Sequence, residues 1–444
     1  MHVLYVAYHF PPIGGPGAHR SLNVTRQLVE NGVDVTVVTG PGPSDEFWTP
    51  QDEMTERAVP GRVRVIRITE PEPTVSGARR RIERWLPGHT KFGAWFERGA
   101  LGSIRKLEER PDVVFGLIVP YECGVAVRDL ADRVGSPWVA DLLDPWALDE
   151  MWLYPTVAQR LLDRLAMRRS LESAAAVIMN TREAAERVRS AFPRLANRVT
   201  TIPSGYDGRD YEATEPSREW DGDFRIVHTG SMHTELGLRH RRTRKIRRIL
   251  GGLPFADVDY LTRSHVYLLR AIDELLEREP WLRDRIRVEF AGALTDADRH
   301  FMKGRPYVHV HGYLSHPEMV ALIRSADLLF LPMHNLGGRA GLVPSKTYEY
   351  LASGRPILAA VPKGDARDLL ESAGTAVVVE PDDSAAMARA ISDSIVLRTP
   401  HHVDLDLVGR FEYRRLGRSI VALLESVRAG RPLPPSDFDE RSAG

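Results

Sequence analysis

Lys346 and Glu349 lie one turn apart in a segment whose residue types could bind an anion and a sugar. A glycine-rich loop over residues 337–341 leads to Pro344 and Ser345, which favour the start of a helix. Such an opening presents backbone N–H groups and the positive end of a helix dipole to an anion, most naturally a phosphate. A carboxylate one turn inside the helix can bind a pair of ribose or sugar hydroxyls. An ordinary capped helix would show the same pattern, so both interpretations stand on this segment alone.

A second glycine-rich loop contains Gly14, Gly15 and Gly17 and precedes a helix that carries Arg20. Glycine allows the backbone to approach an anion closely. The spacing is not that of the G-x-G-x-x-G dinucleotide fingerprint. The loop therefore indicates either an anion site or a tight turn needed for packing.

A third glycine turn, Gly230 and Ser231, ends a strand in the second half of the chain. Arg263 opens a later helix, where it could neutralise a leaving diphosphate. Between them, seven of the ten residues 239–248 are Lys or Arg. This basic run could contact nucleic acid, anionic lipid or an acidic partner, or it could be a solvated insertion.

Asp141, Asp144 and Trp146 lie at the carboxyl end of another apolar run. Two carboxylates and an indole at that position suit hydroxyl binding and sugar stacking, as expected of an acceptor site. Paired carboxylates could also form a metal site or an acid/base pair. No cluster of His or Asp nearby completes a metal set, so we expect no metal. The bland alternative is a capped loop with a buried tryptophan.

Residues 79–106 mix arginine and lysine with Trp85, Phe92, Trp95 and Phe96. Basic and aromatic side chains together suit the interface of an anionic membrane. The alternative is a helix packed on its own domain, with arginine stems lying along apolar surface.

Short apolar runs alternate with amphipathic helical stretches along the chain, which predicts parallel, doubly wound sheets. The pattern restarts after a polar stretch over residues 205–223. We therefore expect two Rossmann-like α/β domains that face each other across a cleft, followed by a C-terminal helix. The expected bounds are 1–205, 206–405 with a basic insertion near 233–262, a helix over 406–430 that packs on the N-terminal domain, and a flexible tail over 431–444.

Composition narrows the classes of protein further. Lys plus Arg equals Asp plus Glu at 60 each, so the net charge identifies no partner. The single cysteine, Cys123, excludes a disulfide framework and fits a reducing compartment. Met1 leads directly into the first apolar run, so we expect no secretory leader, and no run of about 18 apolar residues occurs in the sequence. We expect a cytoplasmic protein, with peripheral contact at the inner face of a membrane through residues 79–106.

These segments, in this order, resemble the family-four glycosyltransferases of the GT-B fold, which are retaining and use nucleotide sugars. The likeness is closest to the bacterial branch that builds capsule, exopolysaccharide and O-antigen. It covers nearly the whole chain, at residues 8–20, 28–39, 141–146, 202–207, 227–232, 310–315, 326–327 and 344–356. The last of these looks like the family's PSK-x-x-EYLA-x-G-x-P block and is the most specific match.

The resemblance implies roles for individual residues. Glu349 would bind the donor ribose, and the segment Gly341, Leu342, Val343 and Ser345 would hold the sugar or phosphate. Arg263 and Lys346 would neutralise the diphosphate, provided that residues 234–262 are an insertion. Gly230 and Ser231 would border the donor, and Gly14 and Gly15 would close on it from the other domain.

Three positions depart from the family pattern. Gly341 stands where the first acid of the family's paired glutamates is expected, Leu143 where an arginine is usual, and Ser204 where the hinge asparagine is usual. The donor sugar would then be held by backbone groups, which weakens any inference about which sugar is carried.

The predicted activity is transfer of a sugar from a nucleoside-diphosphate sugar to an acceptor hydroxyl, with retention and without a metal. The partners would be the nucleotide sugar and a sugar or lipid-linked acceptor, with nucleic acid not expected. One alternative is a nucleotide-sugar 2-epimerase of the same fold. The other is a catalytically silent protein that binds nucleotide sugar or a polyanion through residues 239–248.

Overall fold

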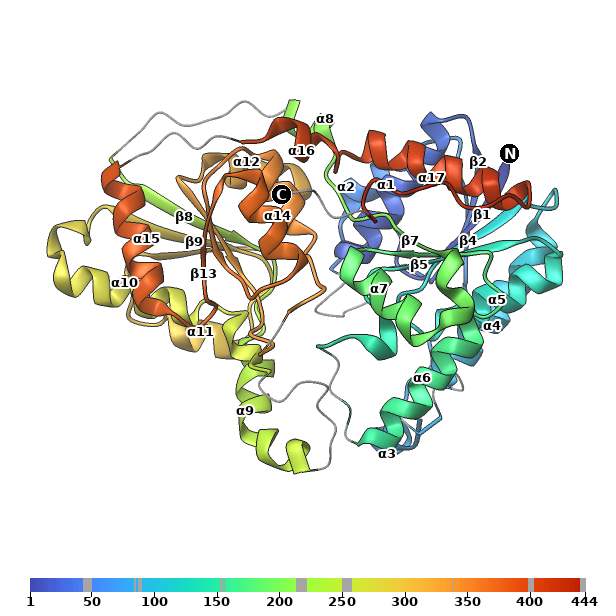
Figure 1. The fold of residues 1–444 in the computed structure, drawn as a ribbon, viewed down its shortest axis with the longest axis horizontal. Coiled ribbons are helices and arrows are strands. Elements are labelled where there is room, and N and C mark those ends of the chain that lie inside the picture. The colour runs from blue at the N-terminus through green and yellow to red at the C-terminus, as the bar shows by residue number, and fades with distance from the viewer. Residues whose placement is uncertain are drawn as a thin grey trace. The chain divides into compact units, whose positions relative to one another are not determined.

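The computed structural model describes residues 1–42, 50–83, 85–86, 90–151, 154, 156–212, 222–249, 258–337, 339–397 and 403–439. The chain divides into two compact units. Unit 1 comprises Met1–Ser204 together with Tyr413–Gly444, and unit 2 comprises Gly205–Glu412. Each unit is built around its own sheet with helices on both faces (Figure 1).

The sheet of unit 1 has seven strands in the order β3-β2-β1-β4-β5-β6-β7, and all neighbouring pairs are parallel. The five inner strands are largely apolar runs buried on both faces, as parallel strands covered by helices must be. The strands are β1 (His2–Ala7), β2 (Asp34–Thr39), β3 (Arg64–Arg67), β4 (Val113–Leu117), β5 (Trp138–Leu142), β6 (Ala176–Met179) and β7 (Val199–Thr201).

Two apolar clusters cover the faces of this sheet. One contains Trp95 and Phe96 of α4, and the other contains Leu416 and Leu424 of α17. Helix α17 lies beside α1 although almost the whole chain separates them in sequence (Figure 1). The helices are α1 (Pro16–Glu30), α2 (Glu53–Arg57), α3 (Gly77–Glu83), α4 (Lys91–Ser103), α5 (Cys123–Val134), α6 (Val157–Leu171), α7 (Arg182–Ala191) and α17 (Tyr413–Arg428), with 3-10 turns η1 (Ile104–Lys106), η2 (Trp146–Leu148) and η3 (Pro193–Arg198).

The sheet of unit 2 has six strands in the order β10-β9-β8-β11-β12-β13, again all parallel. They are β8 (Phe224–Thr229), β9 (Ile286–Ala291), β10 (Val308–Gly312), β11 (Leu328–Pro332), β12 (Ile357–Ala360) and β13 (Ala376–Val379). The helices are α8 (Gly208–Glu212), α9 (Thr234–Ile249), α10 (Val266–Arg278), α11 (Asp296–Met302), α12 (His316–Ser325), α13 (Lys346–Ala352), α14 (Asp365–Ala373), α15 (Ser384–Leu397) and α16 (Leu405–Gly409), with 3-10 turns η4 (Tyr260–Thr262) and η5 (Pro280–Leu282).

Numbered from its own first strand, the sheet of unit 2 reads 3-2-1-4-5-6, which is the Rossmann order, and the sheet of unit 1 has the same order with β7 added at one edge. The prediction of two Rossmann-like, doubly wound domains is confirmed. Ligands of such sheets bind outside the carboxyl ends of the strands, near the point where the strand order reverses. In unit 2 that point lies between β8 and β11, and in unit 1 between β1 and β4.

The C-terminal tail differs from the prediction over residues 431–439. Ser436 donates a hydrogen bond to the Thr201 carbonyl at 2.5 Å, and the Thr201 hydroxyl donates to Asp439 at 2.6 Å. Asp439 also pairs with Arg189 at 2.9 Å. Polar side chains of the tail supply partners for β7 and α7, so this part of the tail is held against unit 1. Residues 440–444 lie outside the described residues.

Most of the expected basic insertion is a regular helix, α9. Residues 250–257 of the insertion are not among those described, and neither are the side chains of residues 247–248.

Candidate functional site

In unit 2, Lys346 reaches back from the start of α13 to the end of β8. Its Nζ donates to the carbonyl of Thr229 at 2.5 Å and lies 3.2 Å from Nε2 of His228. Nδ1 of His228 donates to the carbonyl of Phe330 at 2.8 Å, which leaves Nε2 as the acceptor facing the lysine. Burial lowers the pKa of His228 well below its usual value, and the charge of Lys346 adds to this effect. The neutral ring of His228 and the Thr229 carbonyl therefore hold the amine of Lys346 at the carboxyl end of β8.

Gly230 is required by this arrangement. A Cβ added to Gly230 would lie 2.8 Å from Nζ of Lys346, and the residue has a φ of 95°, which favours glycine. Gly292, at the end of β9, packs against Gly230 in turn, because its own Cβ would lie 2.8 Å from the Gly230 carbonyl. The resemblance implied that Gly230 borders the donor, and in the structure the space beside this glycine holds the lysine amine.

Arg263 is the second cation beside Lys346. Burial lowers the pKa of Lys346 to about 7, and the positive charge of Arg263 acts in the same direction. Each of these two neighbouring cations disfavours the charged form of the other, and a bound anion would relieve this repulsion. The structure thus brings together Arg263, Lys346 and the glycine turn, as the sequence predicted, and the arrangement suits a phosphate.

Two histidines that the sequence did not single out lie in the same region. His233 and His334 are 2.9 Å apart through Nδ1 and Nε2, and Arg263 accepts a hydrogen bond from the His233 amide at 2.9 Å. Burial lowers the pKa of both imidazoles, with Arg263 contributing. Both imidazoles are therefore neutral, and His233 holds the backbone at Arg263. The two histidines are 101 positions apart, so no local sequence pattern connects them.

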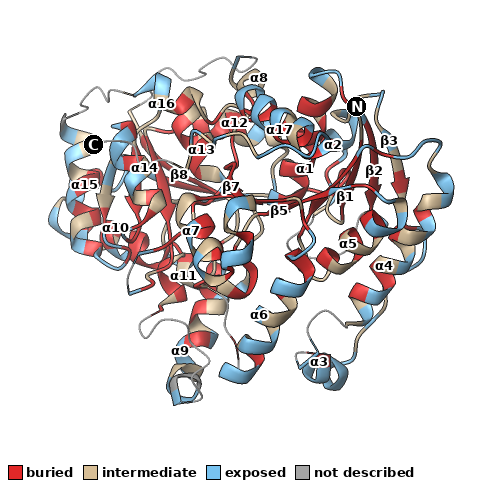
Figure 2. Cartoon of the chain, turned by 45° about the vertical axis from the view of Figure 1, so that its right-hand side comes forward, coloured by how far each residue is buried: buried red, intermediate tan, exposed pale blue. Residues whose placement is uncertain are grey.

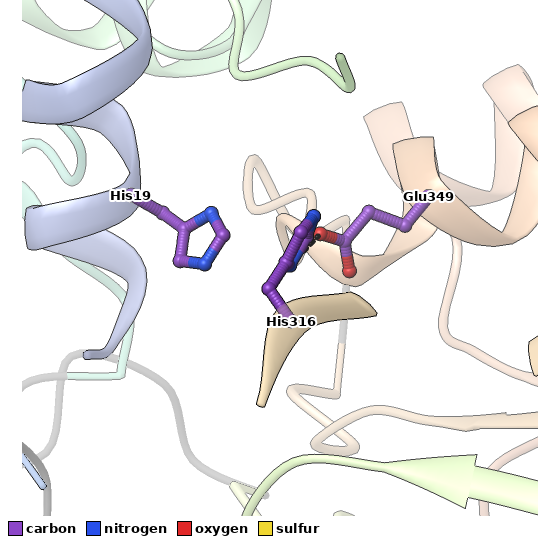
Figure 3. A group of neighbouring side chains, drawn as sticks. All are labelled: His19, His316 and Glu349. Atoms are coloured by element: carbon purple, nitrogen blue, oxygen red, sulfur yellow. Dashed lines mark ion pairs between the residues drawn. The ribbon is translucent and has the colours of Figure 1, made fainter. Parts of the chain in front are cut away.

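Glu349 lies one turn after Lys346, and its carboxylate faces the ring of His316 (Figure 3). Nδ1 of His316 is 3.9 Å from Oε1 of Glu349, and Nε2 is 2.8 Å from Oδ2 of Asp210. Burial acts against the charged imidazole, but the hydrogen bond with Asp210 and the charge of Glu349 outweigh it, so the pKa of His316 is raised. Burial also raises the pKa of Glu349, an effect that His316 opposes.

Helix α8 contacts the same glutamate through its main chain. The Tyr211 hydroxyl donates to the Glu349 carbonyl at 2.9 Å, and Tyr211 accepts a hydrogen bond from Arg324 at its own carbonyl. Side chain and backbone of Glu349 are therefore both oriented by α8, the first helix of unit 2. Neither Asp210 nor His316 was singled out from the sequence.

The loop before α13 is anchored at Ala340. Its amide donates to the Lys363 carbonyl at 2.8 Å, and its carbonyl accepts from Asp365 at 3.2 Å. A Cβ on Gly364, which has a φ of 142°, would overlap the Ala340 carbonyl. This contact fixes the start of the segment that contains Gly341, Leu342, Val343 and Ser345. Gly341 and Val343 are buried, Leu342 is half-buried and Ser345 is exposed.

In unit 1, the first glycine loop forms the start of α1. Gly15 has a φ of 96° and precedes Pro16, the first residue of the helix. The amide of Gly14 donates to the carbonyl of Pro50 at 2.8 Å. That amide is already engaged within unit 1, so an anion at this loop would have to use other groups than the Gly14 N–H.

The prediction that Asp141 binds an acceptor needs correction. Asp141 is fully buried, and both of its oxygens are held by Arg20 of α1, at 2.7 Å from Nε and 2.9 Å from Nη2. Arg20 also donates to the carbonyls of Ile202 and Pro203 at 3.1 and 3.0 Å. This buried pair ties α1, β5 and the segment after β7 together, and it leaves no carboxylate oxygen of Asp141 for a sugar.

Trp146 is likewise a core residue and not an exposed platform for sugar stacking. Its indole is 3% exposed, stacks on Tyr121 at 5.2 Å between ring centroids, and donates from Nε1 to Asp163 at 3.0 Å. Its φ of 46° is unusual for a residue other than glycine. Asp144, two residues earlier, is half-buried. Of the three predicted acceptor residues, only Asp144 keeps exposed surface.

The basic and aromatic segment 79–106 has two different parts. Trp95 and Phe96 of α4 are buried in the core of unit 1, which corrects the prediction for this half. In contrast, α3 is exposed along most of its length (Figure 2), and Ile82, Trp85 and Leu86 are 62%, 46% and 49% exposed. Across the described ranges, no helix has both the length and the apolar character needed to cross a bilayer.

Comparisons with known proteins agree with this architecture. Residues 14–205 match the glycosyl transferase 4-like domain, and residues 259–395 match the glycosyl transferases group 1 family. No curated protein sequence matches the chain. The two matched domains lie in the two Rossmann-like units, and the chain is a glycosyltransferase of the GT-B fold.

Solved structures share this fold at low sequence identity. Sucrose-phosphate synthase from Thermosynechococcus elongatus is similar with a TM-score of 0.65 and 13% identity, over 97% of this chain and 99% of that one. HepE from Anabaena, in complex with UDP-glucose, has a TM-score of 0.61 and 14% identity, over 96% and 100%. MnaA from S. aureus, solved with UDP, has a TM-score of 0.58 and 11% identity, over 99% and 100%.

Proposed function

We propose that this GT-B glycosyltransferase moves a sugar from a nucleoside-diphosphate sugar to an acceptor hydroxyl, with retention of configuration. The observation that carries the proposal is the grouping of Lys346, Arg263 and Glu349 at the carboxyl end of β8. Two cations suit a diphosphate, and a carboxylate one helical turn away suits the ribose hydroxyls. Binding of UDP-glucose by HepE, which has the same fold, supports a nucleotide sugar as the ligand.

The residues also suggest how the bond to the leaving group is weakened. As the sugar–oxygen bond breaks, negative charge develops on the diphosphate, and Lys346 and Arg263 stabilise it electrostatically. A bond forms between the acceptor oxygen and the anomeric carbon, and a leaving phosphate oxygen takes the acceptor proton. The two cations supply the charge that a divalent ion provides in other transferases, so we propose a reaction without metal.

Transfer assays with several nucleotide sugars test this proposal. UDP, GDP, ADP and TDP sugars are first screened by thermal shift, where a ligand at about a hundred times its Kd stabilises by about 2.7 kcal/mol. We then expect sugar transfer that survives EDTA. Glu349→Ala should raise donor KM and reduce turnover, whereas Glu371→Ala, at an exposed position of α14, should not.

Three results would count against parts of this assignment. Full dependence on added metal would rule out the metal-free reaction. Unchanged kinetics of Glu349→Ala would remove its role in donor binding. Release of free nucleoside diphosphate and an epimerised sugar without any acceptor would indicate a 2-epimerase.

We further propose a role in cell-surface polysaccharide or glycolipid synthesis, with α3 resting on an anionic membrane. Exposed Ile82, Trp85 and Leu86 lie next to Arg80 and Arg81, a pairing that suits the interface. Sedimentation with phosphatidylglycerol vesicles should fall after Ile82→Ser and Trp85→Ser. Replacing Ile249, which is 85% exposed in unit 2, is the control, and an equal loss there would refute the role of α3.

A further inference from the structure

A hollow of about 770 Å³ lies along the edge strand of the unit 1 sheet, β3. Four cationic side chains line it, namely Arg64, Arg67, Arg105 and Lys106. Two carboxylates, Glu56 and Glu108, line it as well, so the lining carries an excess of positive charge. Its volume falls in the range of small-molecule sites. The expected ligand is therefore anionic.

Arg67 carries the clearest sign of a missing partner. Its Nη2 donates to the carbonyl of Pro11, whereas Nη1 is buried and finds no hydrogen-bond partner among the residues that the structure describes. Burial lowers the pKa of Arg67, and the charge of Glu56 compensates only in part. A buried guanidinium N–H without an acceptor is destabilising, by about 1–3 kcal/mol for such groups. An oxyanion in the hollow would supply that acceptor.

The other three cationic side chains of the hollow differ in whether they already form an ion pair. Arg64 pairs with Glu108 at 2.6 Å, but both side chains are largely exposed, so the pair contributes little. Arg105 and Lys106 are exposed, and within the described ranges they form no ion pair. Arg105 and Lys106 thus border the hollow without an ion pair among the described residues, and the half-buried guanidinium of Arg67 offers an unused N–H at Nη1.

We propose that this hollow binds a phosphate or diphosphate group carried by the acceptor. Arginine N–H groups form charge-assisted hydrogen bonds with phosphate oxygens, which suits the unused Nη1 of Arg67. Arg67 holds Pro11, which lies in the loop between β1 and α1 that contains Gly14, at the carboxyl end of the sheet. The assignment of this ligand as the acceptor rests on the proposed transferase activity, whereas the presence of an anion site does not.

Calorimetric titration with inorganic pyrophosphate tests the site on the full chain. Because pyrophosphate could also bind beside Lys346, the titration uses the Lys346→Met protein as its reference. Pyrophosphate should still bind there, and adding Arg105→Gln with Lys106→Gln should weaken it at least tenfold. These side chains are exposed, so the fold does not depend on them. The control pair, Arg57→Gln with Arg62→Gln, removes the same charge from exposed positions outside the hollow.

Two results would overturn the proposal: no pyrophosphate binding by the Lys346→Met protein, or equal weakening by the control pair. In transfer assays, the Arg105 and Lys106 variant should raise KM for a phosphorylated acceptor and leave donor KM unchanged. If the wild-type protein transfers no sugar at all, the proposed function fails, while the pyrophosphate titration still decides the anion site.

Discussion

Asp141→Asn should destabilise unit 1 much more than it affects any ligand. The substitution keeps the shape of the side chain but removes the charge that neutralises Arg20, whose side chain is 2% exposed. The guanidinium would keep only the carbonyls of Ile202 and Pro203 as strong acceptors. It would become a buried charge without a counterion, which folded proteins tolerate poorly.

The size of the effect follows from the burial of the pair. Removing one partner of a buried ion pair costs about 3–5 kcal/mol, and every 1.4 kcal/mol changes an equilibrium about tenfold. The opening equilibrium of unit 1 should therefore rise roughly 100- to 5,000-fold. Replacing both partners, as in Arg20→Met with Asp141→Leu, removes the uncompensated charge and should restore much of the lost stability.

Native-state hydrogen exchange is the appropriate assay, because a chain of two units has no single free energy of unfolding. Amides of β1, β4 and β5 should exchange faster by the stated factor, while those of β8 and β9 in unit 2 serve as an internal reference. Asp144→Asn is the matched control, since it removes the same charge from the same strand end.

Two outcomes would refute this reasoning. If Asp141→Asn changed exchange less than about fivefold, the pair would not stabilise the unit as its burial implies. If Asp144→Asn had the same effect, the loss of any carboxylate at this strand end would explain the data. If Asp141→Asn raised the acceptor KM without changing stability, Asp141 would be an acceptor-binding residue after all.

Three further outcomes follow from unit 2. Burial lowers the pKa of Lys346 to about 7, so the free lysine loses its proton as pH rises through 7, and an anion that favours the charged form should bind with proton uptake at pH 8. The calorimetric enthalpy should then vary with the buffer, and Lys346→Arg should abolish that variation. His316→Gln removes the ring that faces Glu349 and should raise donor KM about tenfold, with a smaller change in kcat. Gly364→Ala should lower Tm more than Gly304→Ala, because both have positive φ but only the first meets backbone.

Local patterns were sufficient to predict the two sheets. The strand Trp138–Leu142 is a short apolar run between helical stretches, a pattern with few other interpretations. Lys346 and Glu349 could be placed together for a similar reason, since three residues on a helix span one turn. What local patterns cannot supply is the environment of Lys346, because its partner His228 lies 118 positions away.

The same limit explains the two corrections at the end of β5. A carboxylate and an indole at a strand end look alike whether they bind a sugar or close a buried network. The deciding partner of Asp141 is Arg20, 121 positions earlier, and that of Trp146 is Asp163 on α6. Arg20 is buried in α1 among apolar and small polar side chains, and the sequence gives no local sign that its partner is Asp141.

The return of α17 to unit 1 has a consequence for synthesis of the chain. Residues 205–412 leave the ribosome before residues 413–439, so at about 5–20 residues per second the first sheet waits roughly 10–40 s for its last helix. During that time the apolar face around Val24 and Leu28 lacks the cover that Leu416 and Ile420 later provide. The second unit, whose chain is continuous, can finish folding first. A nascent chain is thus exposed to chaperones and to aggregation through its earliest part, and a truncation at the C-terminus would damage the N-terminal unit.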